Sequence, residues 1–267
     1  MSEAPHLLVE EDGGIIICTL NRPEKLNAMT QQMMELFSDA MIRFRDTDTL
    51  KVMLIRATGR YFCAGADLKG GKGPSQMTAR GIRENHRLGV YGVQAIYDEM
   101  EHIEKPFVIA HHATCVGGGL EMSLSCDFRL AAKSASYSFP EGLFGVLPAS
   151  NGVSRLTRIC GTHWARWLVM ANKPAPADMA YTMGLVHQVF PDESFEEEVM
   201  DFCRHLAGQN GEQMGAAKIA IEIARDVGLE MARHVERMAN SGLMLNPDYQ
   251  ARMAEYVGKL GSGGKGG

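Results

Sequence analysis

Strand-like and helical patterns alternate through about residue 190, and this alternation limits the possible folds more than any other feature of the chain. Two β-rich runs flank Asp12-Gly13-Gly14 and predict a hairpin over residues 7–20. Apolar residues at helical spacing predict a helix from the N-cap Thr30 to about Arg45. Residues 52–57 then predict a short buried strand. Strands that alternate with helices predict an α/β core with parallel pairing.

The middle of the chain continues this alternation around a glycine-rich segment. Residues 70–75 hold three glycines and a proline, and we interpret them as a flexible loop and a candidate lid. A helical pattern then covers residues 78–103 and stops before Pro106. Next come a predicted strand, a short helix and another strand, over residues 107–116, 119–125 and 128–132.

Beyond Pro191 the pattern becomes helical only. Four helices are predicted, over residues 194–207, 214–227, 229–243 and 247–260. We therefore divide the chain into a core over residues 1–191, a helical region over 192–260 and a linker-like tail over 261–267. The helical region is rich in methionine and has more apolar periodicity than one small core face requires, which predicts packing on further copies of the chain.

Composition excludes several classes of protein. The 267 residues include 27 Lys and Arg against 32 Asp and Glu, a net charge of −5, which argues against a nucleic-acid partner. No stretch approaches the ~18 apolar residues of a membrane span, and the N-terminus lacks a secretory signal. The six cysteines form no C-x-x-C pair, so we expect free thiols in a cytoplasmic protein.

A histidine pair beside a cysteine is the nearest approach to a metal site in the sequence. His111, His112 and Cys115 lie in an apolar strand-like run that has no second half-site elsewhere. We therefore interpret them, together with Thr114, as parts of a packed strand. No metal is expected.

Glycine-punctuated turns remain as the candidates for chemistry, because no phosphate-loop, dinucleotide, zincin or serine-hydrolase motif occurs. Gly65-Ala66-Asp67-Leu68 follows one strand end, and Gly117-Gly118-Gly119 follows another and opens a helix. Free backbone N–H groups at such places can bind a developing negative oxygen. A tight turn or a close backbone crossing is the structural alternative.

Two glutamates follow these turns. Glu121 lies in the first turn of the predicted helix, and Glu141 follows Pro140 in a loop 141 − 121 = 20 residues later. Either one alone is explained by the helix dipole or by a solvated turn. Together they indicate a pair of carboxylates for general acid–base work.

Four segments in order carry a family resemblance. They are residues 21–29 (NRPEKLNAM), 62–68 (FCAGADL), 117–121 (GGGLE) and 139–141 (FPE), and they resemble the enoyl-CoA hydratase/isomerase, or crotonase, superfamily from about residue 7 to 260. The resemblance implies an α/β fold with a ββα-spiral core. It also implies C-terminal helices that build a trimer, often paired into a hexamer, and an acyl-CoA thioester ligand without a separate cofactor.

The resemblance also implies roles for individual positions. The N–H groups of Ala66 and Gly118 would form an oxyanion hole for the thioester carbonyl. The positions that it places beside coenzyme A are Leu26, Ala64, Leu68 and Lys69. Arg22 and Lys25 are further phosphate neighbours by charge, with solvated turn residues as the alternative.

One departure from the family pattern follows the second glutamate. Many hydratases have Pro-Gly-x-Gly-Gly where residues 148–152 read Pro-Ala-Ser-Asn-Gly, and Ala113 stands where glycine is common. Ala149 keeps the backbone N–H that in the family helps to place the water, while its methyl group and the side chains of Ser150 and Asn151 alter the pocket wall. We predict an enoyl-CoA hydratase. The alternatives are a Δ3,Δ2-enoyl-CoA isomerase, another crotonase reaction, or a non-catalytic relative that binds a CoA thioester or RNA.

Overall fold

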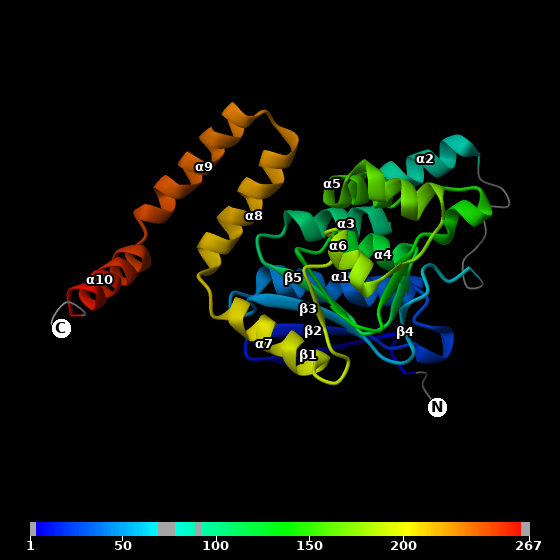
Figure 1. Cartoon of the computed structure of the whole chain (residues 1–267), viewed down its shortest axis with the longest axis horizontal. Coiled ribbons are helices and arrows are strands. Elements are labelled where there is room, and N and C mark those ends of the chain that lie inside the picture. The colour runs from blue at the N-terminus through cyan, green and yellow to red at the C-terminus, as the bar shows by residue number, and fades with distance from the viewer. Residues whose placement is uncertain (1–3, 69–77, 89–91, 263–267) are drawn as a thin grey trace. The chain divides into compact units, whose positions relative to one another are not determined.

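The computed structural model describes residues 4–68, 78–88 and 92–262, and it divides the chain into two compact units, Met1–Gln209 and Asn210–Gly267 (Figure 1). The first unit contains both sheets. The predicted loop over residues 70–75 lies outside the described residues, as does most of the predicted tail. The division falls after Gln209, later than the predicted boundary at residue 191, because helix α7 (Phe195–Ala207) packs on strands β2, β3 and β7 of the first unit.

The larger sheet has six strands in the order β1-β2-β3-β5-β7-β10. β1 and β2 form the predicted antiparallel hairpin, and every other pairing in this sheet is parallel, as predicted. Its strands are Leu7–Asp12, Ile15–Leu20, Val52–Ala57, Phe107–His111, Phe128–Ala132 and Gln188–Phe190. β2 and β5 are buried along their whole length, as is usual for parallel strands that are covered on both faces.

The smaller sheet has four strands in the order β4-β6-β8-β9. β4, β6 and β8 pair in parallel, and β9 runs antiparallel to β8. Its strands are Tyr61–Cys63, Thr114–Val116, Ser136–Ser138 and Ala175–Pro176. The prediction of a single strand over residues 107–116 is therefore wrong. The chain leaves the larger sheet after His111 and enters the smaller one at Thr114.

The helices of the first unit surround these sheets (Figure 1). α1 (Gln31–Asp46) begins at the predicted cap, since the Thr30 hydroxyl accepts a hydrogen bond from the Met33 N–H at 3.1 Å. The predicted helix over residues 78–103 is divided into α2 (Ala79–Leu88) and α3 (Val93–His102). The remaining helices are η1 (Pro23–Lys25), α4 (Gly118–Leu124), η2 (Pro140–Phe144), α5 (Gly152–Ala165), η3 (Arg166–Met170) and α6 (Ala177–Thr182).

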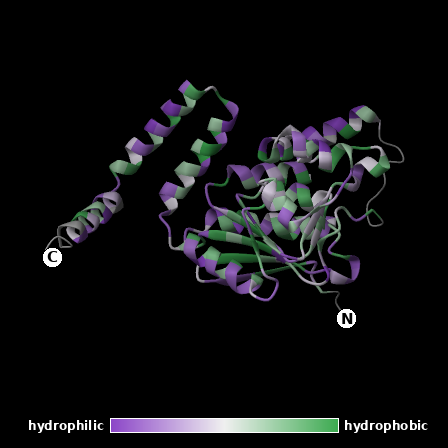
Figure 2. Cartoon of the chain, in the orientation of Figure 1, coloured by the Kyte–Doolittle hydropathy of each residue, from purple (hydrophilic) through white to green (hydrophobic). Residues whose placement is uncertain are grey.

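In its described residues, up to 262, the second unit consists of three helices close to the predicted ranges, α8 (Gly211–Asp226), α9 (Leu229–Met244) and α10 (Pro247–Ser262). Within it, α8 packs against α9. Figure 2 shows apolar and polar residues interleaved along these helices, and the exposed apolar side chains include Ile221, Met238 and Leu245. No helix in the described part of the chain combines the length and the apolar character that crossing a membrane requires.

Candidate active site

Two glycine turns meet where β4 and β6 end. Gly65 and Gly117 have φ angles of +86° and +56°, a region that side chains other than hydrogen strongly disfavour. A Cβ atom added at Gly65 would lie 3.3 Å from the Val116 carbonyl oxygen and 3.5 Å from the Gly118 nitrogen. Glycine therefore lets the two backbones approach each other. This is the close backbone crossing that the sequence analysis gave as the structural alternative to a catalytic role.

The predicted oxyanion-hole residues lie side by side in this arrangement. A Cβ atom added at Gly118 would lie 3.8 Å from the Ala66 nitrogen. Gly118 is the first residue of α4, so its N–H is one of the N-terminal donors that a helix cannot satisfy. Within the described part of the chain, neither this N–H nor that of Ala66 has an acceptor. Two such donors at one helix N-terminus can stabilise a negative oxygen.

Neighbouring contacts hold these donors in place. Met29 forms a bridge to the loop of Ala66: its N–H donates to the Gly65 carbonyl at 2.8 Å, and its carbonyl accepts from the Asp67 N–H at 3.0 Å. The buried Tyr97 hydroxyl donates to the Gly118 carbonyl oxygen at 3.0 Å. Residues from α3, α4 and two loops therefore support a single small site. The sequence analysis did not identify Tyr97, because nothing in the sequence of α3 indicates this contact.

Glu121 lies one turn into α4 and only 5% of its surface is exposed. Its Oε1 accepts a hydrogen bond from the Ser150 N–H at 2.7 Å. The pKa of Glu121 is raised to about 7, chiefly by burial and in smaller part by the nearby charge of Glu141, while the donors at Ser150 and Gly152 oppose the shift. Near neutral pH this carboxyl can therefore either accept or give up a proton.

Glu141 is the second residue of η2 and lies against the start of α4. A Cβ atom added at Gly117 would lie 2.9 Å from Glu141 Oε1. Oε2 is buried and has no hydrogen-bond partner among the described residues. Burial raises the pKa of Glu141 as well. Both predicted carboxyls therefore lie at the oxyanion turn, and their charges interact.

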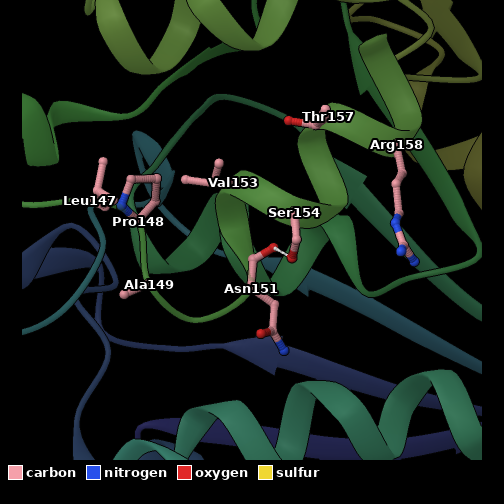
Figure 3. Close-up of a pocket in the computed structure, with 8 residues that line it drawn as sticks. All are labelled: Leu147, Pro148, Ala149, Asn151, Val153, Ser154, Thr157 and Arg158. Atoms are coloured by element: carbon pink, nitrogen blue, oxygen red, sulfur yellow. Dashed lines mark hydrogen bonds between the residues drawn. The ribbon is translucent and has the colours of Figure 1, made fainter. Parts of the chain in front are cut away.

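The segment that departs from the family pattern forms the turn before α5. Ser150 is buried and faces Glu121, whereas Ala149 and Asn151 line an open pocket of about 510 Å³ along residues 147–158 (Figure 3). Ser150 is not among the residues that line this pocket. Gly152 is required on steric grounds, because a Cβ atom there would lie 2.8 Å from Glu121 Oε1.

The predicted coenzyme A positions come together only in part. The Ala64 N–H donates to the Leu26 carbonyl at 3.0 Å, so these two positions are adjacent. Leu68 is 79% exposed and Lys25 is exposed, so both are accessible to a ligand. Lys69 lies outside the described residues.

Arg22 has partners within the protein. Its guanidinium donates to the Asp67 carboxylate at 2.7 Å and to the Ala28 carbonyl at 3.2 Å, and its side chain is 14% exposed. These bonds tie η1 to the loop that carries Ala66. The geometry therefore favours a structural role for Arg22 over the predicted phosphate contact.

Asn27 is a further residue that the sequence analysis missed. It is fully buried with φ +53°, and its amide donates to the carbonyls of Thr58 and Tyr61 at 2.7 and 2.9 Å. Its own Oδ1 accepts from the Arg22 N–H at 2.7 Å. Asparagine tolerates the left-handed conformation and can satisfy three backbone groups there, and its place within the motif of residues 21–29 was the available signal.

His111 belongs to the packed core at the end of β5, whereas His112 is only partly buried and lies between β5 and β6 rather than in the strand predicted for it. The His111 ring lies between those of Phe62 and Tyr137, with centroids 4.7 and 5.1 Å away, and burial lowers its pKa to about 3. His112 Nε2 lies 2.7 Å from the Gly59 carbonyl oxygen. Among the described residues, no three or more His, Cys, Asp or Glu side chains are grouped to hold a metal ion.

Known proteins of one family resemble this chain in sequence and fold. The family model described as enoyl-CoA hydratase/isomerase matches residues 10–262. A short-chain-enoyl-CoA hydratase of Clostridium acetobutylicum is 26% identical over 258 residues, which cover 96% of each chain, and a carnitinyl-CoA dehydratase of Salmonella paratyphi A is 32% identical over 85% of this chain and 80% of its own. The crystal structure of an enoyl-CoA hydratase from Bacillus anthracis has a TM-score of 0.86 at 26% identity and covers 95% of this chain and 96% of that one.

The chain belongs to the enoyl-CoA hydratase/isomerase family. The predicted superfamily and its α/β fold with a helical C-terminal region are thereby confirmed. The comparisons do not reach the roles of single residues, so the catalytic and coenzyme A positions stay predictions.

Proposed function

We propose that this protein is an enoyl-CoA hydratase, which adds water across the double bond of a 2-enoyl-CoA thioester. The observation that carries the proposal is the placement of the buried carboxyl of Glu121 and the partly buried carboxyl of Glu141 beside the N–H groups of Ala66 and Gly118. Relatives that are named short-chain-enoyl-CoA hydratase and crotonyl-CoA hydratase, at 26% and 27% identity, support the same activity.

The N–H pair can stabilise the negative charge that develops during the reaction. When water attacks the β-carbon of the unsaturated thioester, negative charge moves onto the carbonyl oxygen. Donors aimed at that enolate oxygen stabilise the transition state, and the loss of a single such donor in a well-studied enzyme costs about 3 kcal/mol. We assign this role to the N–H groups of Ala66 and Gly118.

The carboxyl pair can carry out the two proton transfers of the reaction. Hydration needs one group to take a proton from water and another to deliver a proton to the α-carbon. Two neighbouring carboxyls with raised pKa values favour a state in which one is protonated and the other ionised. We infer that Glu121 and Glu141 divide these roles, and that the N–H of Ala149 helps to place the water.

Substrate binding completes the proposal. We place the adenine end of coenzyme A at the main chain around Leu26, Ala64 and Leu68, with Lys69 and Lys25 near its phosphates. Hydration transfers no electrons, so it requires no redox cofactor, and we propose that the enzyme uses neither a cofactor nor a metal.

The assembly and the compartment are further parts of the proposal. The exposed apolar side chains of α8–α10 support a homotrimer or a hexamer of this chain. The six cysteines are all free and buried, which supports a reducing compartment such as the cytoplasm. Neither a nucleic acid nor a membrane is expected as a partner.

Incubation with crotonyl-CoA tests the activity. A hydratase removes the ultraviolet absorbance of the conjugated thioester and yields 3-hydroxybutyryl-CoA, which mass spectrometry identifies. An isomerase would instead leave crotonyl-CoA intact and create the same absorbance from a 3-enoyl-CoA. A protein that shifts RNA in a gel and turns over neither thioester would overturn the proposal in favour of a non-catalytic relative.

A further inference from the structure

Arg155 on α5 is a nearly buried cation with two acidic partners on α3. Its side chain is 5% exposed, and its Nε and Nη2 donate to the two carboxylate oxygens of Glu101, each at 2.9 Å. Nη2 also donates to Asp98 Oδ1 at 2.8 Å. A bidentate guanidinium–carboxylate pair is rigid, so it locks the start of α5 to α3.

Asp98 and Arg155 also form hydrogen bonds with the turn that precedes α5. The Asn151 amide donates to Asp98 Oδ1 at 2.6 Å, so one carboxylate oxygen receives donors from both Asn151 and Arg155. Arg155 Nη1 also reaches the Ser150 carbonyl oxygen at 3.5 Å. Both contacts act on the two residues just before Gly152.

This turn touches Glu121 directly. The Ser150 N–H donates to Glu121 Oε1 at 2.7 Å, and a Cβ atom at Gly152 would lie only 2.8 Å from the same oxygen. The fit is so close that a small movement of the turn would break the hydrogen bond or push the carboxyl aside. Asn151, with φ +65°, also sets the direction in which the chain enters α5.

We propose that Arg155, Asp98 and Asn151 are positioning residues that hold the turn of residues 150–152 against the Glu121 carboxyl. They touch no reacting atom and act through the backbone donor of Ser150. The catalytic part of this inference rests on the proposed hydratase function. The structural part, the hydrogen bonds that hold the turn to α3, is independent of that function.

The direction of the expected change follows from the donor. An N–H that points at a carboxyl stabilises its ionised form, so loss of the Ser150 donor raises the pKa of Glu121. Among the described residues, Glu141 on η2 and Tyr97 on α3 also interact electrostatically with Glu121, and the substitutions below leave both in place.

Four variants test the proposal. Asn151→Gly keeps a residue suited to positive φ and removes only the amide bond to Asp98. Arg155→Met removes the charge at similar length, and Arg155→Lys keeps it without the bidentate fork. Arg45→Met is the matched control, because Arg45 also pairs with a carboxylate of α3, Glu99 at 3.0 Å, but does not reach the turn.

Two measurements separate positioning from function. Carbon-13 NMR of side-chain carboxyls, with the Glu121 signal assigned from its loss in Glu121→Gln, reports the pKa without any turnover. We expect Asn151→Gly and Arg155→Met to raise it by about one unit, Arg155→Lys by less, and Arg45→Met not at all. With crotonyl-CoA, kcat should fall by about ten- to a hundredfold in the first two variants while KM changes little.

An unchanged Glu121 pKa in folded Asn151→Gly would overturn the proposal, and so would an equal shift in Arg45→Met. Should Arg155→Met fail to fold, Asn151→Gly still decides, because it keeps the buried ion pair. If the wild-type protein hydrates no enoyl-CoA, the proposed function fails while the NMR titration still tests the positioning.

Discussion

At the scale of single residues, Glu121 has to be both buried and reactive. Its burial raises the pKa to about 7, while the Ser150 N–H at 2.7 Å keeps the ionised form accessible. Gly152 permits this contact only because it lacks a side chain. The chemistry of the site therefore depends on backbone atoms as much as on the carboxyl itself.

The carboxyl pair gives the first prediction. Glu121→Gln and Glu141→Gln should each lower kcat for crotonyl-CoA hydration by about two to four orders of magnitude, because each removes a proton-transfer group. Affinity for coenzyme A, measured by calorimetry, should stay close to wild type. The double variant should lose far less than the product of the two single losses, because the pair acts as a unit.

Near-normal hydration by one of the two variants would make that glutamate structural and favour a one-carboxylate isomerase. Near-normal hydration by both would remove the hydratase assignment and leave the family membership standing.

The raised pKa of Glu121 gives a second prediction, on stability. The folded protein holds this proton up to about pH 7, whereas the unfolded chain releases it near the ordinary glutamate pKa of 4.5, so this group reduces stability as pH rises between these values. Glu121→Gln should therefore gain stability over wild type as pH rises from 4.5 to 7, by at most roughly 3 kcal/mol. Urea unfolding at a series of pH values measures the gain, and a pH-independent difference between the two proteins would contradict the pKa.

At the scale of elements, the site depends on where strands end. β4 and β6 are parallel neighbours, so their carboxyl ends bring the turns of Gly65 and Gly117 together. α4 begins at once after β6, and the N–H of its first residue, Gly118, lies beside the Ala66 nitrogen. α1 supports the arrangement from outside, because its cap Thr30 directly follows Met29, the residue that bridges to Ala66.

The third prediction concerns this cap. Thr30→Ala removes the hydroxyl that accepts from the Met33 N–H and also bonds to His6 Nδ1 at 2.8 Å. We expect the free energy of unfolding to fall by about 1 kcal/mol, as for other N-cap losses. Thr30→Ser keeps the oxygen and serves as the control in the same chemical denaturation experiment. Equal losses in both variants would show that the methyl group, and not the cap, matters.

At the scale of the whole molecule, the second unit buries very few of its many apolar side chains. Among its described residues, only Gly215 and Ala232 are buried, while large apolar side chains such as Met238 (76% exposed) and Leu245 (78%) lie on the surface. Exposed apolar surface on this scale marks a site of association.

The fourth prediction is therefore an assembly of copies of this chain. Light scattering at micromolar concentration should give three or six times the 29.3 kDa of one chain. Met238→Glu should lower that mass, because it places a charge on the apolar surface of α9. Lys259→Glu is the control and should leave the mass unchanged, because it alters a side chain of the same unit that is already charged. A monomeric wild-type protein would contradict the prediction.

Local patterns in the sequence were sufficient for most elements. The hairpin, α1, β3 and the three helices of the second unit follow from apolar periodicity, caps and turn residues, which act within a few positions. The glycine turns and the two glutamates were also visible, because their order and spacing carry the family pattern. The split of residues 107–116 was not visible, because both halves are apolar and extended while only their pairing partners change.

The sequence by itself determined the family, the α/β alternation and the identity of the groups that can do the chemistry. Only the tertiary structure decided what those groups touch: Asp67 for Arg22, 45 positions away, and Asp98 for Arg155, 57 positions away. Contacts at such separations leave no periodic trace in the sequence, since they depend on how strands pair and helices pack. The burial that raises the pKa of Glu121 has the same origin, because it comes from residues of other elements that close around α4.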